Sequence, residues 1–345
     1  MNIIESVFGK LKDGTDVKSY WLENGDIRVK VIEYGATIAA IEIPDKDGIK
    51  QNIVLGYNDL DGFVNDTFFI GATIGRYANR IADGKIDIDG TEYQLEINND
   101  PNHLHGGSLG FHNAVWSSET IKSDEYVGVK LKHFSKDGEG NYPGNLKISV
   151  NYKLFNNRLE IDYNAESDAK TPVNITNHSY FNLDGSDSNL EHKLEINATF
   201  ITPVNSNLIP TGEFKNVSDT VFDFKKSKAV GKDITSSDEQ LKITGGYDHN
   251  FVLDKSDIML KKAASVFSNK SGIRMDLYCT QPGIQFYSGN FLEGCFKCRS
   301  ALCLEPQYFP DSPNKENFEF EYCSPDSNFE ESIHFCFSND NKKVL

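Results

Sequence analysis

Hydrophobic and polar residues alternate along much of this chain, and short turns interrupt the alternation. Residues 86–88 read Ile-Asp-Ile, Asp89-Gly90 follows, and residues 93–97 again alternate between apolar and polar side chains. A period of two on both sides of an Asp-Gly pair is typical of a β-hairpin. The pattern therefore predicts a hairpin over residues 86–97.

The same pattern recurs in longer segments. Residues 146–154 carry an apolar side chain at every second position, Asn156-Asn157 follows, and residues 159–165 return with the same alternation. Residues 27–31 and 41–43 also alternate, and Asp47-Gly48 marks a further turn. Many short strands separated by turn dipeptides predict an all-β fold, organised as a large antiparallel β-sandwich.

The sequence signals for helices and for domain boundaries are weaker than those for strands. No segment keeps a helical period between capping residues, and residues 236–241 permit one or two helical turns. No linker rich in Pro, Gly or Ser divides the chain, and no motif repeats with a period of about 20–50 residues. We therefore expect residues 1–345 to form a single domain with very little helix.

The net charge of the chain argues against some classes of binding partner. The sequence has 51 acidic and 35 basic residues, a formal net charge of -16. Nucleic acids and anionic membrane surfaces would be repelled by this charge. The N-terminal residues show no targeting pattern, and no apolar run is long enough to cross a bilayer. These features predict a cytoplasmic protein that binds neither nucleic acid nor membrane.

All six cysteines lie in the last quarter of the chain, between Cys279 and Cys336. Cys295 and Cys298 have the spacing of a metal knuckle or a redox motif, but no second pair and no βαβ pattern supports either use. Clustered free thiols are the preferred interpretation in a reducing compartment. We expect no metal site and no cofactor.

Two titratable residues lie in surroundings that favour proton transfer. His178 lies in NITNHSYFNL (174–183), a run without charged side chains, and histidine titrates near neutral pH. Glu305 follows an apolar run and precedes Pro306, which raises the cost of ionising it and moves its pKa towards the range of a general base. A structural strand histidine and a buried salt bridge are the alternative interpretations.

Four further segments carry polar side chains beside glycine. GATIGRYANRI (71–81) offers Arg and Asn donors, and GYDHN (246–250) places a carboxylate after two glycines, where a simple turn is the alternative. PNHLHGG (101–107) contains a His-x-His pair, but a cupin-like metal site would need a carboxylate a few residues later, and none follows. PGIQFYSGN (282–290) mixes amides with aromatics, which sugars favour. Together they predict a proton-transfer site for a polyhydroxylated ligand.

Six blocks of this sequence carry a resemblance to a known family. GATIGRYANRI, PNHLHGG, NITNHSYFNL, GYDHNFVL, PGIQFYSGNFL and LEPQYFPDSPN occur in the order found in the aldose 1-epimerases, and the resemblance extends from Gly35 to about Phe337. It implies the large β-sandwich of that family and the interconversion of α and β anomers of free hexoses without a cofactor. The implied partner is a free aldohexose, and the implied assembly is a monomer or a homodimer.

The resemblance also implies roles for individual residues. His178 falls on the catalytic acid and Glu305 on the catalytic base. The substrate-binding positions fall on Asn79, Arg80, His105, Tyr180, Asp248 and Gln285. His103 falls where the family varies, so it is not included. Residues 293–300 are shorter than the usual loop and carry two cysteines, which leaves the preferred sugar open.

The expected chemistry follows from what ring opening requires. Glu305 removes the proton of the anomeric hydroxyl, and His178 delivers a proton to the ring oxygen. Three alternatives remain at this point. An epimerase of phosphorylated hexoses would need basic residues around a phosphate, a non-catalytic relative would bind sugar without converting it, and a glycosidase would use two carboxylates such as Asp248 and Glu305.

Overall fold

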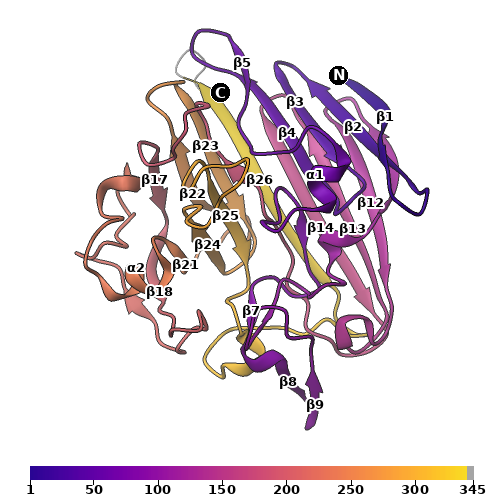
Figure 1. Cartoon of the computed structure of the whole chain (residues 1–345), viewed down its shortest axis with the longest axis vertical. Coiled ribbons are helices and arrows are strands. Elements are labelled where there is room, and N and C mark those ends of the chain that lie inside the picture. Colours follow the sequence, from indigo (N-terminus) through magenta and orange to yellow (C-terminus); the bar gives the residue numbers. More distant parts are fainter. Residues whose placement is uncertain (340–345) are drawn as a thin grey trace.

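The computed structural model describes residues 1–339, and within this range the protein is built mainly from antiparallel strands (Figure 1). These residues contain 26 strands and two short α-helices, α1 (Leu60–Val64) and α2 (Glu239–Thr244). The all-β prediction is therefore confirmed. None of the helices in residues 1–339 has the length and apolar character needed to cross a membrane.

A five-stranded sheet forms the N-terminal part of the fold, with its strands in chain order. Its members are β1 (Asn2–Lys10), β2 (Asp16–Asn24), β3 (Ile27–Ile32), β4 (Thr37–Pro44) and β5 (Lys50–Asn52). Each strand is antiparallel to the next.

A nine-stranded sheet runs the full width of the molecule behind the others. In spatial order it consists of β11 (Ser117–Lys122), β12 (Val127–Ser135), β13 (Leu146–Leu154), β14 (Arg158–Ser167), β26 (Phe329–Asn339), β23 (Ile273–Cys279), β22 (Lys261–Phe267), β17 (Lys193–Ile196) and β20 (Lys228–Ala229). Strand β26, from the end of the chain, lies in the middle of this sheet (Figure 1).

A six-stranded sheet carries much of the candidate site. In spatial order it consists of β16 (Tyr180–Phe181), β25 (Leu302–Gln307), β24 (Gly283–Tyr287), β21 (Asp248–Leu253), β18 (Ala198–Thr202) and β19 (Lys215–Asn216). Three small pairs complete the fold: β6 (Thr73–Ile74) with β15 (Thr176–Asn177), β7 (Arg80–Ile81) with β10 (His103–Leu104), and β8 (Lys85–Ile88) with β9 (Thr91–Gln94).

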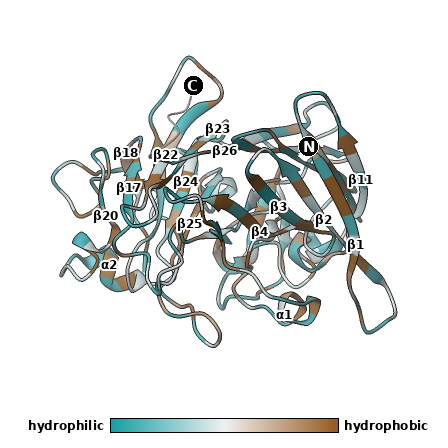
Figure 2. Cartoon of the chain, turned by 90° about the horizontal axis from the view of Figure 1, so that it is seen from above, coloured by the Kyte–Doolittle hydropathy of each residue, from teal (hydrophilic) through white to brown (hydrophobic). Residues whose placement is uncertain are grey.

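One large hydrophobic core joins the three main sheets. Residues from β2–β4, from β12–β14 and from β21, β24 and β25 belong to the same buried cluster. In strands such as β13, apolar and polar residues alternate, so that one face is buried and the other is partly hydrated (Figure 2). Strand β25 differs, because all six of its residues are buried. Glu305 therefore lies on a strand with no solvent-facing side.

The predicted hairpins are confirmed. Strands β13 and β14 pair from Leu154 opposite Leu159, and β8 pairs with β9. Asp89 and Gly90 both have positive φ angles, 53° and 86°, as two-residue hairpin turns require.

The alternation was wrong about where the second strand ends. β9 stops at Gln94, and Ile97, expected within the strand, is 43% exposed. The side chain of Asn98 bonds both the backbone N–H and the carbonyl of Leu104, which draws the chain away from β8 and towards β10.

The helical prediction near residue 240 is confirmed by α2, where the Asp238 side chain accepts from the backbone N–H of Gln240 at 2.9 Å. Helix α1 was not predicted. It is five residues long and begins where Asp59 accepts from the backbone N–H of Gly62. A helix of this length is too short to show a 3.6-residue period.

Candidate active site

Three adjacent strands bring a row of polar side chains together on one face of the six-stranded sheet. Gln285 on β24 lies opposite Glu305 on β25, and opposite Asn250 on β21. Residues opposite each other in antiparallel strands share a face, and Asp248 shares it as a diagonal neighbour of Gln285. The Gln285 side-chain N–H donates to Asp248 Oδ1 at 2.6 Å. Two carboxylates therefore flank one amide.

His178 is held next to this row by the chain between β15 and β16. Its backbone N–H donates to Ala72 O at 2.9 Å, and its carbonyl accepts from the N–H of Gly71 at 3.0 Å. The side chain of Asn177 also donates to Gly71 O, at 2.9 Å. Gly71 has a φ of 68°, and a Cβ there would lie 2.1 Å from the carbonyl oxygen of Ile38. The glycine-rich segment thus serves as the backbone support of the histidine.

His178 and Glu305 form a buried pair. His178 Nε2 lies 3.5 Å from Glu305 Oε2, and the two residues are 5% and 2% exposed. Within residues 1–339, Glu305 Oε2 has no hydrogen-bond partner. A buried carboxylate oxygen without a partner is costly, and a ligand hydroxyl group would satisfy it.

The environment favours the uncharged form of both groups. Burial raises the pKa of Glu305 well above its usual range; the nearby charge of Asp248 adds to the shift, and that of Arg80 opposes it. Burial lowers the pKa of His178 to about 4. Burial therefore opposes a charge on either group.

The second group of predicted residues comes from the β7–β10 pair. Leu104 lies opposite Arg80, and His105 follows with a φ of 52°. His105 Nδ1 accepts from the backbone N–H of Asn79 at 3.1 Å, so the neutral ring carries its proton on Nε2. Burial lowers the pKa of His105 well below its ordinary value, with His178 and Arg80 adding to the shift. His105 is therefore a neutral donor.

Arg80 supplies the positive charge of the site. Its Nε donates to Asn99 Oδ1 at 3.0 Å, which fixes the guanidinium group, and its backbone N–H bonds Asn79 Oδ1 at 2.9 Å. The charge of Arg80 opposes the rise in pKa that burial causes at both Asp248 and Glu305. Arg80 thus favours ionised carboxylates in this site.

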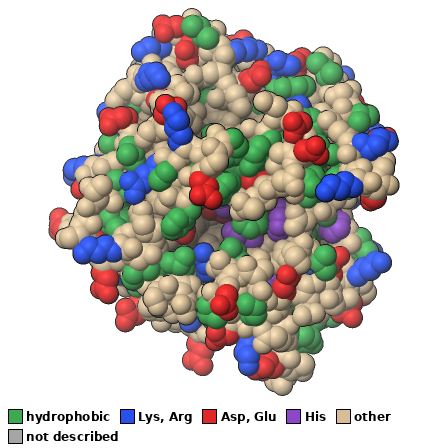
Figure 3. Space-filling view, viewed as in Figure 1, with side chains coloured by type: hydrophobic (Ala, Val, Ile, Leu, Met, Phe, Trp, Pro, Cys, Tyr) green, Lys and Arg blue, Asp and Glu red, His purple; other side chains and the backbone are tan. Residues whose placement is uncertain are grey.

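Contacts link all eight predicted site residues into one group. The His178 ring lies 5.4 Å from the His105 ring and 5.0 Å from that of Tyr180. Tyr180 is 2% exposed and also contacts Tyr287 at 6.1 Å, so it packs behind His178. In the space-filling view, histidine side chains gather in a hollow of the molecular surface (Figure 3).

His103, which the sequence analysis left out, belongs to a different environment. Its Nδ1 lies 2.7 Å from Glu96 O and its Nε2 lies 2.7 Å from Tyr142 Oη. His105 leaves the strand with its positive φ, so the two histidines have separate neighbours.

The sequence analysis missed two neighbours of the catalytic candidates. The Phe69 ring lies 4.7 Å from that of His105 and 5.9 Å from that of His178, and Phe69 has a left-handed φ of 59°. Asp66 accepts from the backbone N–H groups of Phe68 and Ile70 and so fixes this loop. The second neighbour is Cys303, whose Sγ lies 3.6 Å from His178 Nδ1. No local pattern in the sequence indicated either contact.

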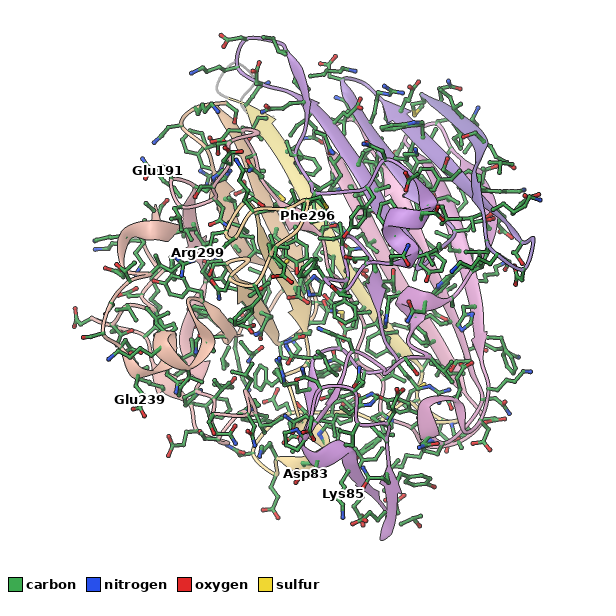
Figure 4. The ribbon with its side chains drawn as sticks, in the orientation of Figure 1. Asp83, Lys85, Glu191, Glu239, Phe296 and Arg299 are labelled. Atoms are coloured by element: carbon green, nitrogen blue, oxygen red, sulfur yellow. The ribbon has the colours of Figure 1, made fainter. Side chains whose placement is uncertain are left out.

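Residues 288–301 connect β24 to β25, and Figure 4 labels Phe296 and Arg299 on this loop, in front of the strands. The ring of Phe296 contacts that of Tyr57 at 5.1 Å, and Arg299 Nη2 donates to Gly245 O at 2.9 Å. Cys295 and Cys298 on the same loop are exposed, and they are free thiols like the other four cysteines.

Comparison with known proteins identifies a family, relatives and a solved structure that this chain resembles. The family model described as Aldose 1-epimerase matches residues 18–335. The galactose mutarotase of Bos taurus is 39% identical over 98% of this chain and 99% of its own length. The aldose 1-epimerase of Escherichia coli (strain K12) is 39% identical over 84% of this chain and 86% of its own. The crystal structure of galactose 1-epimerase from Lactobacillus acidophilus superposes with a TM-score of 0.87 at 29% identity, covering 98% of this chain and 99% of that one.

Proposed function

The chain belongs to the aldose 1-epimerase family and is an isomerase, and we propose that it interconverts the α and β anomers of free hexoses such as galactose and glucose. The observation that carries the proposal is the buried pair of His178 and Glu305. Its two facing atoms are 3.5 Å apart, and Glu305 Oε2 has no other partner in residues 1–339. A sugar whose anomeric hydroxyl and ring oxygen reach these two atoms supplies the missing partners.

The proposed reaction begins with transfer of the Glu305 proton to His178. The resulting carboxylate is stabilised by Arg80, whose charge acts on it. Glu305 then takes the proton of the anomeric hydroxyl, while His178 Nε2 gives its proton to the ring oxygen. The ring opens to the aldehyde, the bond next to it rotates, and the reverse transfers close the ring with the other anomer. General acid–base catalysis by each group contributes about 10²–10⁴-fold.

The remaining residues of the site bind and orient the sugar in this proposal. His105 presents a neutral Nε2–H as a donor, because its Nδ1 already accepts from Asn79. Asp248 accepts from sugar hydroxyls, and Gln285 fixes its carboxylate through the 2.6 Å bond. Arg80 adds charged donors. Tyr180 keeps the His178 ring in place from behind, with ring centres 5.0 Å apart.

The localisation, the number of domains and the assembly of the protein are also proposals. We propose a cytoplasmic protein with one domain, acting as a monomer or a homodimer. The six free cysteines suit a reducing compartment, and a single core cluster reaches from β2 to β26. The hydrophobic core thus supports one cooperative unit rather than two.

Polarimetry on freshly dissolved α-galactose tests the proposed activity. Purified protein is expected to speed the decay of optical rotation in proportion to its concentration, without added metal or cofactor. A time course equal to that in buffer would refute the proposal.

A substrate panel separates the alternatives. Free galactose, free glucose and a hexose 6-phosphate are compared at equal concentration, and the free sugars are expected to react faster. A faster phosphorylated sugar would indicate the hexose-phosphate alternative. A measurable heat of sugar binding, together with a rate of anomer exchange equal to that in buffer, would indicate a non-catalytic relative.

A further inference from the structure

Cys303 lies on the same strand as Glu305 and faces the same way. The two residues are separated by one position in β25, and alternate residues of a strand share a face. Cys303 Sγ lies 3.6 Å from Nδ1 of His178, whose Nε2 lies 3.5 Å from Glu305 Oε2. The structure thus brings a thiol, an imidazole and a carboxyl group together. One ligand atom from each residue lies within 4.8 Å of the other two.

We propose that His178, Cys303 and Glu305 bind a thiophilic divalent cation such as Zn²⁺, and that the bound cation inhibits the enzyme. The binding part stands on the geometry of the three side chains. The inhibition part rests on the proposed function, because it assigns His178 and Glu305 to proton transfer.

The spacing of the donor atoms suits a tetrahedral cation. Zn²⁺ lies about 2.3 Å from sulfur and about 2.0–2.1 Å from nitrogen or oxygen, so two donors on one ion are about 3.3–3.7 Å apart. The distances of 3.5 and 3.6 Å already lie in this range. They involve different nitrogens of one ring, and one ligand atom from each residue lies within 4.8 Å of the other two, so the three side chains must move closer together to bind one ion. Three protein ligands leave the fourth position for water.

The charges of the site also suit a divalent cation. Cys303 and Glu305 are both buried, so a cation bound between them has to be neutralised by its ligands. A cation that displaces both protons leaves a thiolate and a carboxylate, whose two negative charges neutralise its double positive charge. A neutral cluster avoids the cost of a buried net charge. Glu305 Oε2, which has no partner in residues 1–339, gains one.

The bound cation competes with catalysis rather than assisting it. His178 and Glu305 must be free to exchange protons with the sugar, and a metal occupies their lone pairs. Sulfur makes the site selective, because thiolate ligands favour Zn²⁺ over Mg²⁺ and Ca²⁺.

Cys295 and Cys298 form a competing thiol pair that the experiment must remove. They are exposed on the loop before β25, whereas Cys303 is fully buried. The double variant Cys295→Ser/Cys298→Ser is expected to keep the activity of the natural protein. It serves as the background for all metal titrations.

The experiment titrates Co²⁺, as a spectroscopic probe of the Zn²⁺ site, into the metal-free background variant. We expect thiolate-to-cobalt charge-transfer absorption that saturates at one equivalent. Zn²⁺ should abolish the band and slow mutarotation in competition with sugar, and EDTA should restore the rate. In Cys303→Ser the band should disappear, and the Zn²⁺ inhibition constant, measured against that variant's own metal-free rate, should rise at least about tenfold.

Each other outcome counts against the proposal. A band that requires Cys295 and Cys298 assigns the metal to the loop. Zn²⁺ inhibition that is unchanged in Cys303→Ser removes Cys303 as a ligand. A saturating band without inhibition leaves the metal site standing and refutes the proposed role of His178 and Glu305. If Cys303→Ser does not fold, Cys303→Ala is used, because alanine removes the ligand without adding a polar group.

Discussion

Two buried histidines of this protein show how a structural environment differs from a candidate catalytic one. His103 and His178 are 0% and 5% exposed, and burial lowers the pKa of both. His103 has a partner at 2.7 Å on each ring nitrogen. His178 instead faces a sulfur at 3.6 Å and a carboxylate oxygen at 3.5 Å.

Between these two residues, burial and the direction of the pKa shift do not differ, whereas the hydrogen bonding of the ring nitrogens does. Short contacts on both nitrogens leave no room for a ligand at His103. The longer contacts of His178 are open to one, as is the Glu305 oxygen that lacks a hydrogen-bond partner among residues 1–339. The predictions below test this difference.

The largest effect is expected from Glu305→Gln. The variant keeps the size of the side chain but cannot accept a proton from the anomeric hydroxyl, so kcat should fall about 10²–10⁴-fold. Polarimetry measures the rate, and thermal unfolding checks that the fold is retained. Glu166→Gln, on the exposed face of β14, is the matched control and should keep the natural rate. Full activity in Glu305→Gln would remove this residue as the base.

The second prediction concerns stability in acid. The fold keeps His178 neutral down to about pH 4, whereas the unfolded chain protonates near the ordinary pKa of 6.5. The folded-state pKa is depressed, so the stabilisation is complete above pH 6.5 and is lost as the pH falls to about 4. In His178→Gln, the free energy of unfolding should therefore fall by about 3 kcal/mol less between pH 6.5 and about pH 4 than it does in the natural protein. Denaturant unfolding between these pH values measures it. Parallel curves for the two proteins would contradict the assignment.

The third prediction concerns His103, the histidine with a partner on each ring nitrogen. His103→Phe leaves Glu96 O and Tyr142 Oη without their partner, which should lower the free energy of unfolding by about 1–3 kcal/mol. The kcat of the folded variant should stay near that of the natural protein. A large loss of kcat with unchanged stability would place His103 in the catalytic site after all.

The smallest effect is expected from Gln285→Ala. Without the 2.6 Å bond from Gln285, the Asp248 carboxylate loses its fixed position. KM for galactose should rise about tenfold, while kcat changes less, because Asp248 binds substrate in the proposal and transfers no proton. Initial rates over a range of galactose concentrations separate the two constants. A loss confined to kcat would instead place Gln285 in the proton-transfer step.

Local patterns in the sequence predicted local structure well. The hairpins around Asp89-Gly90 and Asn156-Asn157 follow from a period of two and from turn chemistry, both of which involve neighbouring residues. The same patterns said nothing about which hairpins share a sheet. The order β16–β25–β24–β21 joins residues more than 100 positions apart, as in the pairing of Tyr180 with Cys303.

Because sequence patterns involve neighbouring residues only, they indicated some residues of the candidate site and not others. The type and flanking residues of His178 and Glu305 indicated proton-transfer chemistry, and the family resemblance supplied the binding positions. The approach of Cys303 to His178 depends on the pairing of β16 with β25 and left no trace in the spacing of the cysteines. Phe69 reaches His105 through a left-handed backbone conformation, which a sequence pattern does not announce for phenylalanine.

The position of β26 has a consequence for how the protein is made. Residues 329–339 are inserted between β14 and β23 at the centre of the nine-stranded sheet (Figure 1). During synthesis, β14 and β23 leave the ribosome with a gap between them and with their hydrogen-bonding edges unpaired. The sheet closes after the last described strand has been released from the exit tunnel. The centre of the nine-stranded sheet is therefore completed by the described strand that is synthesised last, and β14 and β23 expose unpaired edges until then.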